Sequence, residues 1–228
     1  MLNQNDLATW YARLNLNDQA RKIIEQVRSS EPTRRVGGGH SNVSGFYPSR
    51  KMGKTIQFES HRVELAAIYE MEHDPLTLEF YDQPPSIVLD YKSKDGRRVV
   101  VRHTPDFFVL RQDNSGWEEW KAEEDLTRLA EKSPNRYRQD AGCWRCPPGE
   151  AVANESGLYY RVRSRLRFIG AFSATFNSFK IIFVLMRAPC PPKLAPGLWR
   201  MRTPGRPQLW QTCSRKRRRS LQQTMSTF

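Results

Sequence analysis

Apolar side chains recur every three or four positions in residues 6–28, which is the spacing of one face of an α-helix. Charged residues fill the positions between them. The pattern therefore predicts one or two helices that pack on the rest of the protein, or alternatively offer a surface to a partner. The apolar positions are Leu7, Trp10, Tyr11, Leu14, Ala20, Ile23, Ile24 and Val27.

After a connector at residues 30–57, the apolar pattern alternates between helical and strand periods. Strands that are followed by helices favour an α/β sandwich. Helices are predicted at 59–72 and 123–132, with a short helix at 148–155 after a segment rich in tryptophan and proline. Strands are predicted near 77–82, 86–92, 97–103, 105–111, 117–121 and 159–162.

Residues 104–121, TPDFFVLRQDNSGWEEWK, carry the most informative pattern. Asp106 precedes an apolar run that predicts a strand buried on both faces. The turn is expected at residues 113–116, Asp-Asn-Ser-Gly. Because strand side chains alternate between faces, Glu119 and Lys121 share one side of the next strand, and a tight hairpin brings that side near Asp106.

Two carboxylates and an ammonium at one place suit the metal-assisted cleavage of a phosphodiester. Carboxylate oxygens bind hard divalent cations. A bound cation supplies hydroxide and stabilises the leaving oxygen, while Lys121 would steady or deprotonate the attacking water. By itself this spacing occurs by chance in many chains, and the alternative is a solvated hairpin with an ordinary Lys–Glu edge.

A third carboxylate lies on the helix predicted at 59–72. Ser60 is a candidate cap for this helix, although Glu64 falls one place beyond a strict capping box. Glu59 and Glu64 would lie on different faces of the helix, so only one of them can serve the site. The alternative for either residue is a solvated glutamate on a helix surface.

Residues 30–164 resemble the amino-terminal nuclease domain of TnsA-type transposon endonucleases. The resemblance is carried by FESHRVELAAIYEMEHDPLTLEFYDQPPSIVLDY, GRRVVVRHTPDFFVL, WEEWKAEEDL and AEKSPNRYRQDAGCWRCPPGEAVANESGLYYRVRS. It implies a restriction-endonuclease-like α/β fold, in which helices flank a mixed sheet. On the family's pattern the helix glutamate falls on Glu64, counted back from His73-Asp74-Pro75, with Glu59 as the weaker alternative.

The same pattern places the strand aspartate on Asp106 and the lysine on Lys121, with Glu119 two positions before the lysine. The resemblance implies that Glu64, Asp106 and Glu119 bind one or two Mg²⁺ ions, or Mn²⁺ in their place. It also implies that Lys121 orients or activates the attacking water. In-line attack on phosphorus would leave a 5′-phosphate and a 3′-hydroxyl.

The resemblance further implies one subunit of a heteromeric cut-and-paste transposase, which nicks DNA at the 5′ ends of a mobile element. A TnsB-like transposase would make the 3′-end breaks and transfer the strands, and a TnsC-like ATPase would regulate the assembly. One alternative is a restriction- or repair-type nuclease on the same fold. The other is a non-catalytic remnant that binds DNA or partner subunits.

Four residues near this site are candidates for weaker DNA contacts. A basic, Gly/Ser-rich segment that includes Arg50, Lys51 and Lys54 precedes the predicted catalytic helix, and such a loop can position a duplex through its phosphates. His103, beside Thr104-Pro105-Asp106, could touch the scissile phosphate. The alternatives are a solvated connector and, for His103, a strand residue that lies beside the site.

The 228-residue chain has a net charge of +13, but the excess lies at one end. Residues 165–228 hold 13 of the 37 Lys and Arg residues and none of the 24 Asp and Glu residues, so residues 1–164 carry 24 charges of each sign. A neutral nuclease should bind DNA weakly by itself and depend on partners.

These observations predict an amino-terminal helical segment (1–29), a nuclease domain (30–164) and a basic, proline-rich tail (165–228). The tail is interpreted as a disordered arm that grips phosphates, as a solvated low-complexity segment, or as translation out of frame from near Ser164. Read one nucleotide earlier, the codons permitted at 175–184 allow N-x-Q-F-L-Q-D-Y-F-R, which resembles the family's own continuation. The frameshift interpretation fits best.

Location follows from the same composition. No apolar run approaches the roughly 20 residues of a membrane span, and the first residues carry no signal segment. The sequence therefore predicts a cytoplasmic protein of bacteria that acts at the nucleoid.

Overall fold

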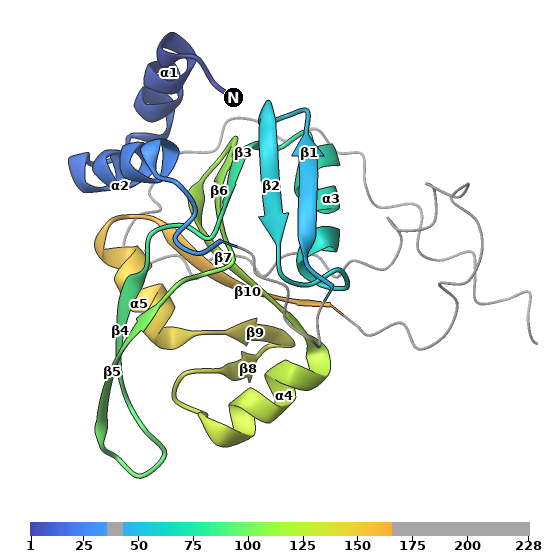
Figure 1. Ribbon diagram of the computed structural model, residues 1–228. Helices are drawn as coiled ribbons and strands as arrows, with labels where there is room; N and C mark the ends of the chain where they lie inside the picture. The colour runs from blue at the N-terminus through green and yellow to red at the C-terminus, as the bar shows by residue number, and fades with distance from the viewer. Residues whose placement is uncertain (36–42, 166–228) are drawn as a thin grey trace, which may run out of the picture. The chain divides into compact units, whose positions relative to one another are not determined.

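The computed structural model describes residues 1–35 and 43–165, and Figure 1 labels their helices and strands. The predictions for the tail beyond Arg165, including its reading frame, lie outside the described residues. The helices are α1 (Gln4–Leu14), α2 (Asp18–Ser29), α3 (Glu64–His73), α4 (Glu123–Lys132) and α5 (Pro147–Glu155). The strands are β1 (Gly45–Ser49), β2 (Lys54–Phe58), β3 (Thr77–Asp82), β4 (Ile87–Lys92), β5 (Arg98–His103), β6 (Phe107–Arg111), β7 (Ser115–Ala122), β8 (Arg138–Asp140), β9 (Cys143–Arg145) and β10 (Tyr159–Arg165).

The amino-terminal segment forms two helices, α1 and α2, in agreement with the one or two helices that the apolar spacing predicts. Both begin at an asparagine whose side chain accepts a hydrogen bond from the first turn, Asn3 for α1 and Asn17 for α2. The indole N–H of Trp10 donates to the carbonyl of Arg111 at 2.9 Å. This bond ties α1 to the end of β6.

A four-stranded sheet in the order β10-β7-β6-β3 forms the centre of the fold. β10 runs parallel to β7, whereas the other pairs are antiparallel, so the sheet is mixed. Every residue of β6 is buried, as its apolar run predicts. Five helices flank this sheet, and the architecture is that of a restriction-endonuclease-like fold.

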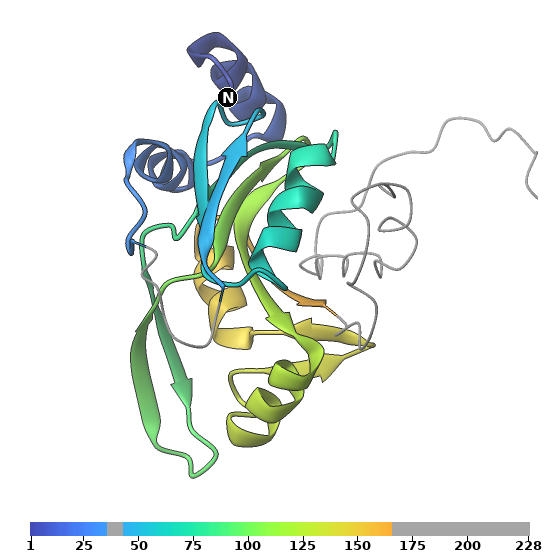
Figure 2. The ribbon, with the colours of Figure 1, turned by 45° about the vertical axis from the view of Figure 1, so that its right-hand side comes forward.

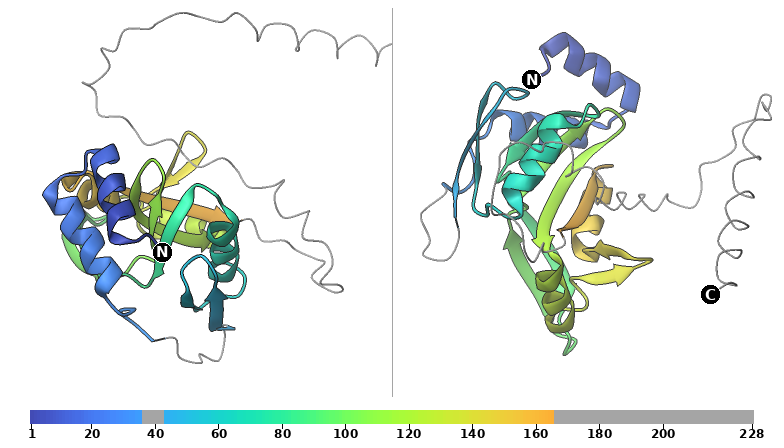
Figure 3. Two further views of the ribbon diagram at one scale, coloured as in Figure 1. Left: turned by 90° about the horizontal axis from the view of Figure 1, so that it is seen from above. Right: turned by 90° about the vertical axis from the view of Figure 1, so that its right-hand side faces the viewer.

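Two helices cover opposite faces of the sheet, as Figures 2 and 3 show for α3 and α5. Side-chain contacts of β10 agree, because Arg163 pairs with Glu70 of α3 and Tyr160 packs on Gly149 of α5. Among the described residues, no helix is both long enough and apolar enough to cross a membrane.

Two hairpins lie where the sequence predicted no regular structure. β1 and β2 pair within the expected connector, and β8 and β9 pair within the Trp/Pro-rich segment. The first hairpin depends on distant contacts, because the Glu72 carboxylate accepts from Ser49 Oγ and from the N–H groups of Arg50 and Lys51. The local pattern of residues 30–57 carries no sign of these bonds.

Helix α3 begins at Glu64, five residues later than predicted. Ser60 Oγ accepts a hydrogen bond from the N–H of Val63 at 3.2 Å, so it stabilises the turn before the helix and does not cap the helix itself. This shorter start places Glu64 in the first turn of α3, where a carboxylate is favoured by the helix dipole.

The β6–β7 turn is also shorter than predicted, because Ser115 and Gly116 already belong to β7. Gly116 pairs with Tyr159 at the start of β10. A Cβ at position 116 would lie 2.0 Å from the carbonyl oxygen of Tyr159. Glycine is therefore required here by the close approach of two backbones, not by turn geometry.

We expect Gly116→Ala to lower the free energy of unfolding by about 3 kcal/mol or more, because backbone cannot move aside as a side chain can. Urea denaturation of the full chain measures the loss. Gly53→Ala is the control, since its Cβ has no atom within 4 Å and only its positive φ of 62° is strained, at about 1 kcal/mol. Equal losses in both variants would contradict the packing argument.

Candidate active site

Asp106 stands directly before β6 and is held by two other elements. Its Oδ2 accepts a hydrogen bond from the N–H of Trp120 in β7 at 2.7 Å. Its own carbonyl accepts from the N–H of Gln83, which follows β3, at 3.0 Å. Gln83 is buried with a left-handed φ of 46°. The hairpin thus brings β7 to Asp106, as the sequence predicts.

Glu119 and Lys121 lie on the same face of β7, as strand alternation predicts. Lys121 Nζ lies 2.9 Å from Glu119 Oε1. The Glu119 side chain is fully buried, whereas 26% of the Lys121 side chain is exposed. The ammonium therefore stands between a buried carboxylate and the surface.

Two tyrosine hydroxyls share the same carboxylate. Tyr137 donates to Glu119 Oε1 and Tyr160 donates to Oε2, each at 2.8 Å. His103 Nε2 lies 2.9 Å from the Tyr160 oxygen and 3.6 Å from Glu119 Oε2. Both oxygens of Glu119 are consequently occupied by protein donors.

Arg136 fixes the tautomer of His103. Its Nη2 lies 3.1 Å from His103 Nδ1, and a guanidinium can only donate, so Nδ1 accepts and the proton of a neutral ring is on Nε2. A chain of hydrogen bonds therefore runs from Arg136 through His103 and Tyr160 to Glu119.

The electrostatics of this cluster keep Glu119 and Lys121 charged. Burial lowers the pKa of Lys121, but the charges of Glu119 and Asp106 outweigh it and raise the pKa well above its ordinary value. Burial raises the pKa of Glu119, yet Lys121 and His103 bring it well below its ordinary value. Asp106 is shifted the other way, because burial raises its pKa more than Lys121 lowers it.

Glu118, the adjacent carboxylate in WEEWK, faces the opposite side of the sheet. Its Oε1 accepts from Arg111 Nη2 at 2.8 Å and from the Tyr159 hydroxyl at 3.1 Å. Arg111 also bonds Asp74, at the end of α3, at 2.6 Å. Glu118 therefore joins β6, β7, β10 and α3, and takes no part in the site.

Glu64 comes to the site from α3, and Glu59 does not. Burial, and then the negative charge of Asp106, raise the pKa of Glu64, so the two carboxyls are within electrostatic range of each other. Glu64 Oε2 accepts from the backbone N–H of Glu59 at 2.7 Å. The Glu59 side chain turns instead toward Arg34, at 3.7 Å. The charges of Asp106 and Lys121 thus act on the Glu64 carboxyl, whereas the Glu59 side chain lies near Arg34.

The four predicted DNA-contact residues lie in different environments. Arg50 and Lys54 are exposed. Lys51 corrects the prediction, because its ammonium donates to the carbonyls of Met71, Asp74 and Thr77 at 2.6 to 2.8 Å and so stabilises the end of α3. His103 is a mostly buried member of the Glu119 network, 15% exposed.

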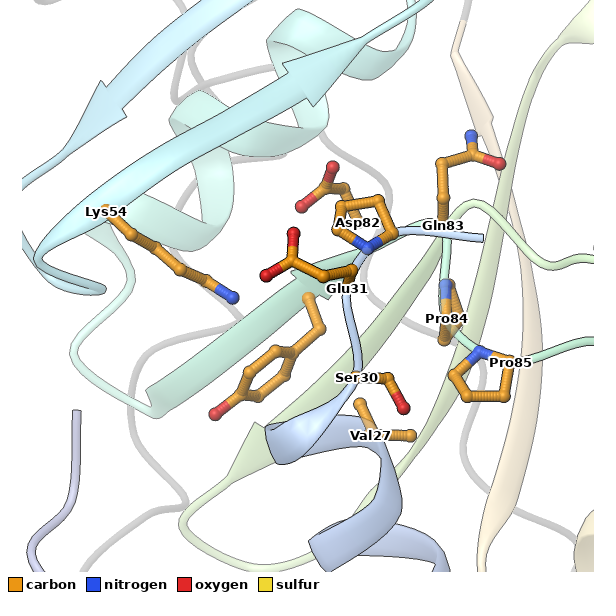
Figure 4. A pocket seen from close by; sticks show the side chains of 10 residues that line it. Val27, Ser30, Glu31, Lys54, Asp82, Gln83, Pro84 and Pro85 are labelled. Atoms are coloured by element: carbon orange, nitrogen blue, oxygen red, sulfur yellow. The ribbon is translucent and has the colours of Figure 1, made fainter. Parts of the chain in front are cut away.

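A small hollow is lined by Lys54, Tyr81, Asp82 and Gln83, together with residues at and after the end of α2 (Figure 4). Two of the lining residues are in contact, because Lys54 Nζ lies 4.6 Å from the centre of the Tyr81 ring. Asp82 is buried and accepts from Gln57 Nε2 at 3.1 Å. This hollow contains none of the predicted catalytic residues.

Among the residues that the structure describes, no group of three or more His, Cys, Asp or Glu side chains is placed to hold a metal ion. Within the same residues, hydrogen bonds reach only Oδ2 of Asp106 and Oε2 of Glu64. Each of these carboxylates has one oxygen without a hydrogen bond from these residues, whereas protein donors engage both oxygens of Glu119.

Sequence reasoning did not find Tyr137, Tyr160, Arg136 or Gln83. The first three lie 18 to 41 residues from Glu119 or His103 in the chain, and no local period marks them. Gln83 acts through its backbone, although the Pro84-Pro85 pair beside it signals an unusual local conformation. Only the three-dimensional fold brings these groups together.

Residues 74–164 match the family model described as "TnsA-like endonuclease N terminal". The matched segment contains Asp106, Glu119 and Lys121, and Glu64 lies ten residues before it. No curated protein matches the chain. The match supports a TnsA-type nuclease domain that includes residues 74–164.

Proposed function

We propose that the protein is a metal-dependent DNA endonuclease subunit of a heteromeric cut-and-paste transposase, which cleaves at the 5′ ends of the mobile element. The observation that carries the proposal is the convergence of Asp106, Glu119 and Lys121 on one side of the β6–β7 hairpin, with Glu64 within electrostatic range of Asp106. The match of residues 74–164 to a TnsA-like endonuclease supports the DNA substrate.

The side chains of this site are of the type that binds a hard divalent cation, Mg²⁺ or Mn²⁺. Glu64 and Asp106 each have one carboxylate oxygen that accepts no hydrogen bond from the described residues, and burial and then the charge of Asp106 raise the pKa of Glu64. A cation would offset the repulsion between these two carboxylates, and oxygen ligands are the ones that Mg²⁺ prefers. Glu119 would be the third ligand and would exchange one donor for the metal. When bound, the cation would generate the attacking hydroxide and stabilise the leaving oxygen.

The protonation state of Lys121 decides which of its two predicted roles, orienting or activating the attacking water, it can have. Its pKa is raised by Glu119 and Asp106, so the ammonium remains protonated at neutral pH. A protonated amine donates hydrogen bonds and cannot take a proton from water. We therefore assign Lys121 to orienting the attacking water and stabilising the charged phosphate, with Glu119 fixing its position.

The resemblance to TnsA-type endonucleases supports two partners, a TnsB-like transposase and a TnsC-like ATPase regulator. Both would assemble with this subunit in the bacterial cytoplasm. A restriction- or repair-type nuclease on the same fold is the alternative for the biological context. Genes for a TnsB-like protein beside this one decide for transposition.

One observation favours a second candidate, a non-catalytic remnant that binds DNA or partner subunits. Lys121 and two tyrosines already engage both oxygens of Glu119, so a metal would compete with these donors for the carboxylate. A cleavage assay separates the two candidates.

We expect the full chain, alone or with a TnsB-like partner, to nick DNA in Mg²⁺ or Mn²⁺ and to leave a 5′-phosphate and a 3′-hydroxyl. Asp106→Asn and Lys121→Ala should each reduce the cleavage rate by a factor of about 100 or more, the loss typical of a single charge-stabilising group. Product ends are mapped on end-labelled duplexes.

Glu131→Gln and Lys132→Ala are matched controls, because they remove one carboxylate and one ammonium from exposed positions of α4. Melting curves show whether each variant is folded. Cleavage by Lys121→Ala at the wild-type rate, or no cleavage by any protein, would establish the remnant instead.

The pH dependence of stability tests the Glu64 environment. Burial, and then the charge of Asp106, raise the pKa of Glu64 from 4.5 to about 7. The folded state therefore loses stability as pH rises between these values. Glu64→Gln removes this loss, so without metal it should stabilise the protein by up to about 3 kcal/mol at pH 8 and little at pH 5. Unfolding by urea at both pH values measures the difference.

Metal binding to the same carboxylates should be visible without any cleavage. Because a ligand that binds only the folded state stabilises it, Mg²⁺ should raise the melting temperature of the wild-type protein. Asp106→Asn should reduce the shift and Glu131→Gln should preserve it. A shift of equal size in all three proteins would place the bound cation elsewhere.

A further inference from the structure

We propose that the β4–β5 hairpin is a DNA-binding arm whose outer face lies in a groove of the duplex beside the cleavage site. The inference rests on the proposed function, since it supplies the hold on DNA that a nuclease with an evenly balanced charge needs. It commits to double-stranded DNA as the occupant of this face.

The hairpin is rooted in the candidate active site at both ends. β4 follows Gln83, whose N–H holds the carbonyl of Asp106. β5 ends at His103, which contacts the Tyr160 hydroxyl at 2.9 Å, and Asp106 comes three residues later. A duplex held by the hairpin would therefore be positioned directly relative to the catalytic carboxylates.

One face of the hairpin is buried and the other is free. Figures 1 and 2 show the two strands reaching beyond the central sheet. The inner face includes Leu89, which is fully buried, and the carbonyls of Lys92 and Ser93 near the tip accept from Asn135 Nδ2. The outer face is solvent-exposed and consists of Val88, Asp90, Lys92, Arg98, Val100 and Arg102.

The charge of the hairpin differs from that of the chain around it. Residues 86–104 hold five Lys and Arg against two Asp, within residues 1–164 that hold 24 of each sign. Arg98 is paired with Asp90, whereas Lys94, Arg97 and Arg102 are exposed and have no side-chain partner among the described residues. Unpaired cations on an exposed element are suited to phosphate contacts.

The outer face also carries two apolar groups, Val88 and Val100, which are 53% and 58% exposed. Val88 pairs with Arg102 across the strands. In DNA recognition, arginine reads guanine and apolar side chains contact the methyl group of thymine, and the major groove admits a two-stranded β-ribbon. A ribbon face that combines both types of group matches this chemistry.

The length of the hairpin fits about half a helical turn of DNA. Its strands β4 and β5 have six residues each. At about 3.3 Å per residue such a strand spans roughly 20 Å, against the ~34 Å turn of a B-form duplex. The arm would contact about six base pairs to one side of the cut.

Binding of a labelled 40-base-pair duplex in Ca²⁺, measured by fluorescence anisotropy across a salt titration, tests the arm. A triple variant with Lys94→Gln, Arg97→Gln and Arg102→Gln should bind about tenfold or more weakly, with a salt slope smaller by about 0.9 per lost phosphate contact. The control removes three exposed charges from α2, α4 and β8 by Lys22→Gln, Lys132→Gln and Arg138→Gln, and should bind more tightly than the hairpin variant.

A positional measurement complements the titration. The photoreactive residue p-benzoylphenylalanine in place of Val100 should crosslink to the duplex. The same residue in place of exposed Leu76, beside the far end of β6, should not. Equal affinities for the two triple variants, or no crosslink from position 100 on bound DNA, would overturn the inference. A hairpin variant that binds DNA with the wild-type affinity but no longer binds a TnsB-like partner would also overturn the inference.

Failure of the proposed function gives a different result. A protein that never cleaves in Mg²⁺ but crosslinks through position 100 would be a DNA-binding remnant with the arm intact. If the hairpin variant cleaves DNA at the wild-type rate, the protein is a nuclease that does not use the β4–β5 hairpin to bind DNA.

Discussion

The site depends on a buried carboxylate that is compensated from every side. Glu119 is fully buried, and a charge in such a place is costly unless it is paired and hydrogen-bonded. Lys121, Tyr137 and Tyr160 supply that compensation from β7, from the segment before β8 and from β10. The carboxylate therefore joins elements that have no local reason to meet.

Strand alternation divides the WEEWK segment into two functions. Glu118 binds Arg111 and Tyr159 on the α3 face, while Glu119 and Lys121 form the site on the other face. Arg111 extends the first network to Asp74 and Thr77. The α3 face thus has its own buried ion pair that fixes α3 against the sheet. Because Glu64 begins α3, this second network also determines where the third carboxylate lies relative to Asp106.

How much the sequence predicted follows from the range of each interaction. The apolar run of β6, the alternation of Glu119 with Lys121 and the α/β order depend on neighbouring residues, and these predictions are confirmed. The β1–β2 hairpin was missed because Glu72, from a later helix, organises it. Lys51 was predicted as a phosphate contact because its charge is visible in the sequence, whereas the three carbonyls that engage it are not. The choice between Glu59 and Glu64 likewise needed the observed start of α3.

Net charge was the least informative sequence property, and the structure shows why. Summed over residues 1–164, the charges cancel, which predicted weak binding to DNA. The sum counts Arg111, Arg28 and Lys51 equally with Arg97, although the first three are engaged inside the protein by Glu118, Glu79 and backbone carbonyls. Only unpaired, exposed cations release counterions from DNA. A chain that is neutral overall can therefore present an exposed basic element if many of its acidic residues form buried ion pairs with other basic residues. In this protein the β4–β5 hairpin has that character, and only three residues separate the end of β5 from the start of β6.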